Sequence, residues 1–217
     1  MPPGRGAETL SHPYEALNPD LMLDAVASTG LLPDGYLLAL NSYENRVVQV
    51  GIEEQSPMVA KFYRPERWSD AAIEEEHRFA IELAAQEIPV VPPWHTGNGV
   101  TLFHHGAFRF ALFPRRGGRA PEPGDLDQLE WIGRFIGRIH LTGQTRAFAH
   151  RPPLDVADLG WPARSEVLAS PLLPAHLHEA YAEISERLLD KVEERLSAVG
   201  AARIRVHGDC HHGNILW

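Results

Sequence analysis

The end of the chain carries the feature that most restricts its fold. Asp209 and Asn214 stand five residues apart, and His207 precedes them, in the pattern H-x-D-x-x-x-x-N. A phosphotransferase catalytic loop needs this spacing, because a carboxylate must orient and deprotonate an attacking hydroxyl and an amide oxygen must then hold Mg²⁺. We expect a short strand over Arg203–Val206, leading into the loop. The rest of the chain must then supply a nucleotide site.

The first half of the chain has the pattern of a small antiparallel sheet. Five apolar runs bounded by turn residues predict strands, and they are Gly35–Leu40, Arg46–Ile52, Met58–Tyr63, Val100–Phe103 and Phe108–Phe113. A polar turn at 104–106 joins the last two runs. A short helix is expected from Asn18 or Asp20 to Ser28. Ser69–Ala85 predicts a longer helix, inserted after the third strand.

The second half of the chain is mainly helical. Residues 115–124 are rich in Gly, Pro and Arg, which indicates a linker, and we place a domain boundary between 1–114 and 115–217. Pro152–Pro162 is expected to be irregular, and residues 1–11 a mobile tail. Two stretches with helical spacing of apolar residues follow the boundary, and they are Asp125–Thr142 and Pro174–Val199.

Lys61 is a candidate phosphate-binding residue. A lone lysine on a strand more often points into solvent than into a site. Here a helix with three successive glutamates follows the strand, and phosphotransferases of the kinase type hold phosphates with a strand lysine paired to a helix glutamate. Among the three, Glu76 shares a helix face with Phe79 and Leu83 better than Glu74 does. We therefore expect Glu76 to point inward and to meet Lys61.

The tip Asn41–Asn45 is a second candidate phosphate contact. A loop that cradles phosphate with its backbone N–H groups is usually rich in glycine, and this tip has none. Ser42 could offer its hydroxyl and its N–H. A polar hairpin turn is the commoner explanation of such a tip.

The terminal loop is also open to a metal-site interpretation. Its side chains include several that zinc accepts as ligands, and they are His207, Asp209, Cys210, His211 and His212. No second ligand cluster is evident elsewhere in the sequence. A metallo-hydrolase or structural zinc site is therefore an alternative to the phosphotransferase loop, as is a plain surface loop with local turn hydrogen bonds.

Composition limits the partners and the compartment. The net charge of −9 argues against a protein that binds nucleic acid or an anionic membrane surface. Cys210 is the one cysteine, which fits a reducing compartment. Residues 1–7 lack the apolar core of a signal peptide, and no apolar run approaches a membrane span of ~20 residues. We therefore expect a cytoplasmic protein.

Several motifs in order resemble a known family. Val206–Trp217, VHGDCHHGNILW, is similar to the H-G-D-x-x-x-x-N loop of the aminoglycoside phosphotransferase and choline kinase superfamily, which shares the protein kinase fold. Five further stretches narrow the resemblance to the bacterial stress response kinase A family. They are NSYENRV (Asn41–Val47), VAKFYRPERWS (Val59–Ser69), EEHRFAIEL (Glu75–Leu83), FALFPRRGGR (Phe110–Arg119) and IGRIHLTG (Ile136–Gly143). The resemblance runs from about Leu17 to Trp217.

The resemblance implies an α+β, protein-kinase-like bilobal fold. Its N-lobe would be an antiparallel five-stranded sheet with one inserted helix, followed by the first part of a mainly helical C-lobe. It also implies a cytoplasmic Ser/Thr protein kinase that uses ATP and Mg²⁺. Asp209 would be the catalytic base and Asn214 a Mg²⁺ ligand.

The same resemblance implies a nucleotide site in the N-lobe. Ser42 would lie at the ATP phosphates. Lys61 would contact the α- and β-phosphates, with Glu76 as its ion-pair partner. Residues 110–114 would form the hinge against the adenine, with Phe113 among the binding residues.

One departure and three alternatives accompany the resemblance. The family has a second acidic Mg²⁺ ligand shortly after the catalytic loop, and the chain ends at Trp217 before such a residue. We therefore expect a truncated chain with poor activity by itself. The alternatives are a small-molecule kinase acting on an amino alcohol, sugar or aminoglycoside, a non-catalytic nucleotide-binding domain, and the metallo-hydrolase.

Overall fold

The computed structural model describes residues 13–217, so the tail expected over residues 1–11 lies outside the described residues. The chain divides into two compact units. One contains the described residues up to Ile139 together with His207–Trp217, and the other is His140–Val206. The terminal loop thus belongs to the same unit as the sheet. The boundary that we expect after Pro114 stays a prediction.

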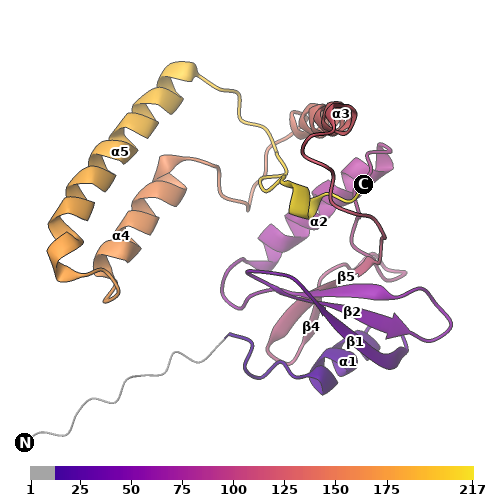
Figure 1. Ribbon diagram of the computed structural model, residues 1–217. Helices are drawn as coiled ribbons and strands as arrows, with labels where there is room; N and C mark the ends of the chain where they lie inside the picture. Colours follow the sequence, from indigo (N-terminus) through magenta and orange to yellow (C-terminus); the bar gives the residue numbers. More distant parts are fainter. Residues whose placement is uncertain (1–12) are drawn as a thin grey trace, which may run out of the picture. The chain divides into compact units, whose positions relative to one another are not determined.

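The first unit is built on a five-stranded antiparallel sheet with the order β1-β2-β3-β5-β4 (Figure 1). The strands are β1 (Pro33–Leu40), β2 (Arg46–Ile52), β3 (Met58–Phe62), β4 (Phe103–His105) and β5 (Phe108–Pro114). Strands β1, β2 and β3 form a meander, and β5 inserts between β3 and β4. The expected five strands are therefore present.

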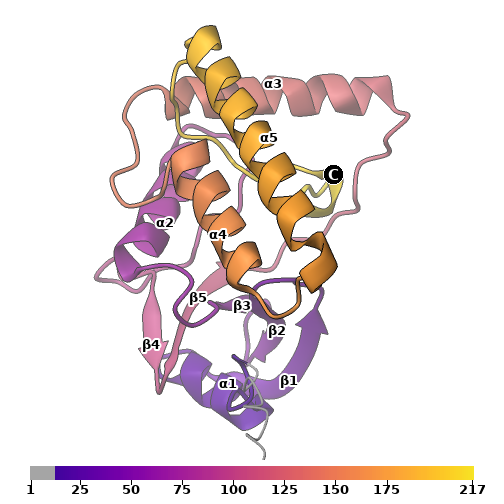
Figure 2. The same cartoon turned by 90° about the vertical axis from the view of Figure 1, so that its left-hand side faces the viewer.

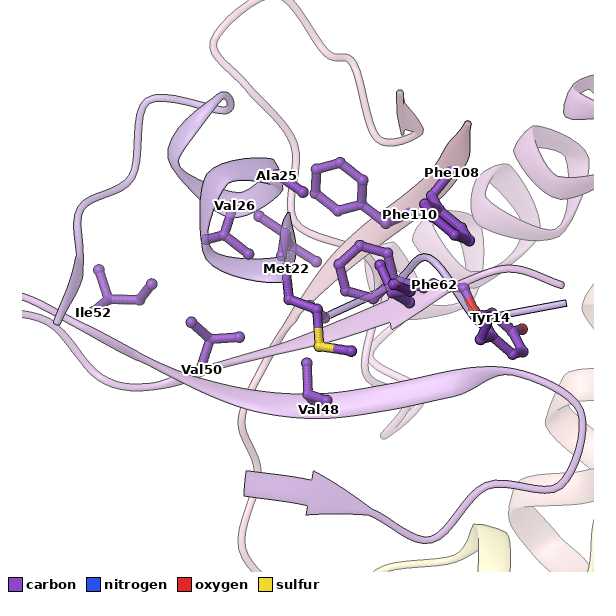
Figure 3. Packing of buried hydrophobic residues seen from close by; sticks show 13 residues of the cluster. Tyr14, Met22, Ala25, Val26, Val48, Val50, Ile52, Phe62, Phe108 and Phe110 are labelled. Carbon is purple, nitrogen blue, oxygen red and sulfur yellow. The ribbon is translucent and has the colours of Figure 1, made fainter. Parts of the chain in front are cut away.

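Helix α1 (Pro19–Ala27) covers one face of the sheet. The Asn18 side chain caps it by accepting a hydrogen bond from the Leu21 N–H at 2.8 Å, and Pro19 fits the first turn because its missing N–H is not needed there. The apolar side of α1 packs on β2, β3 and β5 (Figure 3). The fully buried members of this core include Val26, Val50, Phe62 and Phe110.

Helix α2 (Asp70–Ala85) lies on the opposite face of the sheet. Ser69 caps it through a hydrogen bond from the Ala72 N–H at 3.2 Å. Its first turn is tied to the sheet, because the Asp70 carboxylate accepts a hydrogen bond from Arg109 at 2.8 Å and pairs with His104 at 2.9 Å. The Arg109 hydrogen bond is the main reason why the pKa of Asp70 lies below its usual range.

Helix α3 (Leu126–Gly143) begins in the first unit and ends in the second. The second unit continues with a π-helical turn (Val156–Gly160), α4 (Trp161–Ala169), a 3₁₀ turn (Ala175–Leu177) and α5 (His178–Val199). Helices α4 and α5 lie side by side (Figure 2). Arg164 links them through hydrogen bonds to Ser185 Oγ and the Ala182 carbonyl, at 3.0 and 2.9 Å.

Several local expectations are wrong. Residues 152–162 are not irregular throughout, because the Asp155 side chain accepts a hydrogen bond from the Asp158 N–H and starts the π-helical turn, which leads into the unforeseen α4. Arg203–Val206 is not a strand, since the Arg205 N–H donates to the carbonyl of Gly143 at 3.2 Å, at the end of α3.

The fourth strand is also displaced from its expected range. It runs over Phe103–His105 instead of Val100–Phe103, so the expected turn residues His104 and His105 lie in the strand. The Thr96 N–H donates to the Val100 carbonyl at 3.1 Å and closes a turn there, which delays the strand. Pairing with β5 begins only at Phe103, opposite Phe110.

Candidate active site

Lys61 and Glu76 form an ion pair between strand β3 and helix α2. The Lys61 Nζ lies 3.4 Å from Glu76 Oε1. The exposed fractions of the two side chains are 26% and 38%, so the pair is sheltered but not closed off from a ligand. Two positions predicted from separate stretches of sequence are thus brought into contact.

An apolar strip lies on the same sheet face as Lys61. In an antiparallel sheet, directly paired residues point to the same face, and Lys61 is paired with Val47, which is paired with Leu40. The neighbouring row on this face contains Leu38, Gln49, Val59 and Phe113. We call the apolar members of these rows that are not buried the inner strip, and they are Leu38, Leu40, Val47, Val59 and Phe113.

The inner strip remains partly accessible. Leu38 and Leu40 are exposed, and Val47, Val59 and Phe113 are half-buried. An accessible apolar surface beside an ammonium group suits a ligand with a flat apolar part joined to an anion. Phe113 also packs edge-on against His77 at a ring-centroid distance of 6.3 Å, so α2 helps to fix it.

The tip between β1 and β2 is anchored behind Ser42. Ser42 itself is exposed. Two residues further on, the Glu44 carboxylate accepts a hydrogen bond from Trp68 Nε1 at 3.3 Å and lies 3.4 Å from Arg67 Nε. The Tyr14 hydroxyl donates to the Glu44 carbonyl at 3.1 Å. These contacts hold the base of the tip to the segment before α2 and leave Ser42 exposed.

The terminal loop brings Asp209 and Asn214 together. The Asn214 Nδ2 donates hydrogen bonds to the backbone carbonyl and to Oδ2 of Asp209, both at 2.9 Å. Gly208 adopts φ +79°, a conformation that favours glycine and that turns the chain just before Asp209. The Asp209 side chain is 76% exposed, so its carboxylate is available to a hydroxyl.

The end of the loop is fastened to the segment that follows the sheet. The Trp217 N–H donates to the Arg119 carbonyl at 2.8 Å, and the Arg119 N–H donates to the Trp217 carbonyl at 3.2 Å. Gly118 permits this approach, because a Cβ there would lie 2.9 Å from the Leu216 Cβ. The loop is thus fastened to the stretch after β5, within the compact unit that contains Lys61.

The donor set of the loop suits Mg²⁺. Magnesium prefers oxygen ligands, and carboxylates and amides supply them. Because the Asn214 Nδ2 is engaged by Asp209, its Oδ1 is the amide atom that remains for a cation. Within residues 13–217, no group of three or more His, Cys, Asp or Glu side chains is arranged to hold a metal ion.

Four of the six predicted site residues form two contacting pairs, and the other two lie on the sheet face of Lys61 and at the tip between β1 and β2. Lys61 contacts Glu76, and Asp209 contacts Asn214. Phe113 shares the sheet face of Lys61, while Ser42 lies at the tip.

Sequence reasoning missed the residues that support Lys61. Tyr63 lies under the lysine, with its ring centroid 4.9 Å from Nζ, and its hydroxyl is 2.7 Å from Nε2 of the buried His77. The i, i+2 spacing of Lys61 and Tyr63, which puts both on one strand face, was the available signal. The role of Glu44 had no comparable local signal.

Comparison with known proteins shows the family. Residues 37–217 match the phosphotransferase enzyme family, APH, and the chain belongs to this family. It is 42% identical over 204 residues to the serine/threonine protein kinase RdoA of Salmonella typhimurium, and 41% identical over 204 residues to stress response kinase A of Escherichia coli K12. Both alignments cover 94% of this chain, which spans 62% of the length of either relative.

Solved structures show the same fold. An amicoumacin kinase, hAmiN, in complex with AMP-PNP, Ca²⁺ and Ami matches with a TM-score of 0.69 at 19% identity, covering 94% of this chain and 62% of that one. Spectinomycin phosphotransferase, APH(9)-Ia, in complex with ADP and spectinomycin matches with a TM-score of 0.58 at 15% identity, covering 91% and 64%. The expected α+β, protein-kinase-like fold is therefore confirmed. Across residues 13–217, no helix is long and apolar enough to cross a membrane.

Proposed function

We propose that the chain carries the ATP-binding and catalytic residues of a serine/threonine protein kinase. The observation that carries this proposal is the placement of two pairs in one compact unit, Lys61 with Glu76 and Asp209 with Asn214. The first pair supplies a positioned cation for phosphates, and the second supplies a base beside an amide oxygen. The kinase names of the relatives support the same function.

The nucleotide binds on the inner strip in this proposal. The adenine packs on the apolar side chains between Leu38 and Phe113, and residues 110–114 form its hinge. Lys61 neutralises charge on the α- and β-phosphates while Glu76 holds its ammonium in place. The exposed Ser42 contacts the phosphates from the tip. The 114/115 boundary would separate this nucleotide-binding part from the part that carries the catalytic loop.

The γ-phosphoryl group then passes directly from ATP to a hydroxyl. The acceptor oxygen forms a bond to the γ-phosphorus as the bond from that phosphorus to the β–γ bridging oxygen breaks, which releases ADP. Asp209 orients the hydroxyl and accepts its proton. Asn214 and oxygen atoms of the nucleotide would hold Mg²⁺, which supplies charge neutralisation when bound.

The acceptor is a Ser or Thr hydroxyl of a protein in this proposal. The support is the identity of 42% with a relative named as a serine/threonine protein kinase. The name of the Escherichia coli relative leads us to propose a role in bacterial stress response. The single cysteine supports a cytoplasmic location in this proposal. A second candidate is a small-molecule alcohol, because the fold neighbours with the stated complexes are kinases for small molecules.

A transfer assay with acceptor panels tests the function. The protein expressed from its complete gene is incubated with γ-labelled ATP and Mg²⁺, first with Ser/Thr peptides and proteins and then with amino alcohols, sugars and aminoglycosides. Label on Ser or Thr, absent in Asp209→Ala, supports the proposal. Label on a small alcohol alone supports the second candidate. ATP binding without any transfer would indicate a non-catalytic nucleotide-binding domain and contradict both.

A further inference from the structure

A row of contacting side chains begins directly under Lys61. The Lys61 Nζ lies 4.9 Å from the centroid of the Tyr63 ring and 3.4 Å from Glu76 Oε1. An ammonium is attracted by the negative face of an aromatic ring and by a carboxylate. The ring and the carboxylate together restrain the lysine on two sides, while 26% of its side chain stays exposed.

Tyr63 is in turn held by buried groups. Its side chain packs between the sheet and α2, in a cluster with Ile73, Leu102 and Ala111, and the residue is 3% exposed. Its N–H donates to the Arg109 carbonyl at 2.9 Å, which fixes the backbone at the end of β3. Its hydroxyl lies 2.7 Å from His77 Nε2, and His77 Nδ1 lies 2.9 Å from Thr101 Oγ1.

His77 completes the row without adding a charge. The residue is 1% exposed, and burial lowers its pKa to about 4. The imidazole is therefore neutral at neutral pH, with one nitrogen as donor and the other as acceptor. It can satisfy both the Tyr63 and Thr101 hydroxyls, so a shift of the Tyr63 hydroxyl or a turn of the His77 ring would break at least one of these hydrogen bonds. A charged imidazole would instead repel the Lys61 ammonium.

We propose that Tyr63 is a positioning residue for Lys61, and that the hydrogen-bonded row Tyr63–His77–Thr101 fixes the Tyr63 ring under the ammonium. The ammonium is then ordered before a phosphate arrives, so less conformational freedom is lost on binding. The inference rests on the proposed function only in taking Lys61 as a phosphate contact. The position of the lysine can be tested without any nucleotide.

The first test is spectroscopic. The chain contains two lysines, Lys61 in β3 and the exposed Lys191 in α5. Lysine-selective ¹³C labelling therefore places an ε-methylene signal on each of them, and Lys61→Arg and Lys191→Arg identify the two signals by their loss. The Lys61 signal is expected upfield of the Lys191 signal because of the Tyr63 ring current. In Tyr63→Leu it should move to the position of Lys191.

The matched control for this test is Phe62→Leu. Phe62 directly precedes Tyr63 at the end of β3, is also buried, and points to the α1 face. The control removes the Phe62 ring and leaves the Tyr63 ring under Lys61. The Lys61 signal should therefore stay upfield of the Lys191 signal. A Lys61 signal that is the same in wild type and Tyr63→Leu overturns the inference.

The second test is a double-mutant cycle on Mg-ATP affinity. Tyr63→Leu should raise the Kd by ~2-fold to ~30-fold, the range of one cation–π contact. Tyr63→Phe keeps the ring but loses the bond to His77, so its Kd should lie between those of wild type and Tyr63→Leu. In the Lys61→Met background, Tyr63→Leu should have no further effect, because the lysine that it positions is gone.

The outcomes separate this inference from the proposed function. Wild-type protein that binds no ATP would overturn the proposed function, while the lysine signal would still decide whether Tyr63 positions Lys61. ATP binding that weakens in Lys61→Met but not in Tyr63→Leu would overturn the inference alone. An equal loss from Tyr63→Leu in both backgrounds would show that Tyr63 acts on the fold and not through Lys61.

Discussion

The side-chain amide of Asn214 donates hydrogen bonds to both the backbone carbonyl and the Oδ2 of Asp209, each at 2.9 Å. This arrangement fixes the orientation of the amide, with its nitrogen toward the carboxylate and its oxygen away from it. The proposed base and the proposed metal ligand therefore position one another. The five-residue spacing permits this because a 3₁₀ turn, His212–Asn214, returns the chain to Asp209.

Removal of the Asn214 amide should weaken metal binding. In Asn214→Ala the amide oxygen is lost, and the Mg²⁺ concentration for half-maximal transfer should rise by ~10-fold to ~100-fold. The measurement is the transfer rate against Mg²⁺ concentration at fixed ATP. Asn98→Ala serves as the control, because it removes an exposed asparagine that is distant in sequence from Asn214. An unchanged Mg²⁺ dependence in Asn214→Ala would exclude it as a ligand.

Stability should fall on acidification because of His77. Its pKa is lowered by burial from 6.5 to about 4, so between these values the unfolded chain binds a proton that the folded chain excludes. The free energy of unfolding should therefore decrease as pH falls from 6.5 to 4, by ~3 kcal/mol for this group.

Urea unfolding of wild type and His77→Gln at pH 7 and pH 4.5 measures this contribution. The pH-dependent loss should be smaller in His77→Gln, because glutamine does not titrate. His95→Gln changes an exposed histidine, so it should keep the wild-type pH dependence. A loss in His77→Gln as large as in wild type contradicts a neutral buried imidazole.

Gly143 should tolerate no side chain. A Cβ at this position would collide with the backbone carbonyl of Arg205, whose N–H donates to the Gly143 carbonyl. Gly143→Ala should therefore lower the free energy of unfolding by ~1–3 kcal/mol. Gly137→Ala is the matched control in the same helix, where a Cβ meets open space and alanine favours the helix by ~0.5–1 kcal/mol. Equal stability of the two variants would contradict the close approach.

The sheet, α1 and α2 could be predicted because their signals are local. Ser69 before α2 and Pro19 in α1 mark helix starts, and the hydrogen bonds of the caps are present in the structure. The contact of Lys61 with Glu76 also follows from local spacing, since each residue lies on the inward side of its own element.

Other parts of the structure depend on contacts between distant residues. The π-helical turn and α4 follow the cap by Asp155, whose carboxylate also pairs with Arg203 at 2.9 Å. Arg205 lies in coil because its N–H donates to the carbonyl of Gly143, 62 positions earlier. The row of side chains under Lys61 includes a hydrogen bond between His77 and Thr101, which are also far apart in the sequence. None of these pairings has a spacing that a single sequence reveals. The predicted helix and strand assignments therefore differ from the observed ones at these places.

Glu76 should affect ATP binding less than Lys61. Glu76→Gln removes the charge of the ion pair but leaves the lysine on the Tyr63 ring, so the Kd for Mg-ATP should rise by no more than ~10-fold. Lys61→Met removes the phosphate contact itself and should raise the Kd further. Isothermal titration of Mg-ATP measures both. The reverse order would assign the main role to Glu76 and contradict the proposed phosphate contact.

The most direct test of the central claim compares ATP binding with phosphoryl transfer in Asp209→Ala. Both quantities are measured on the same preparation, the Kd by titration of Mg-ATP and the transfer rate with γ-labelled ATP. The account predicts a transfer rate lower by at least ~10²-fold and a Kd within ~2-fold of wild type, because Asp209 takes a proton and does not hold the nucleotide. Transfer that persists in Asp209→Ala, or binding that is lost together with transfer, would contradict it.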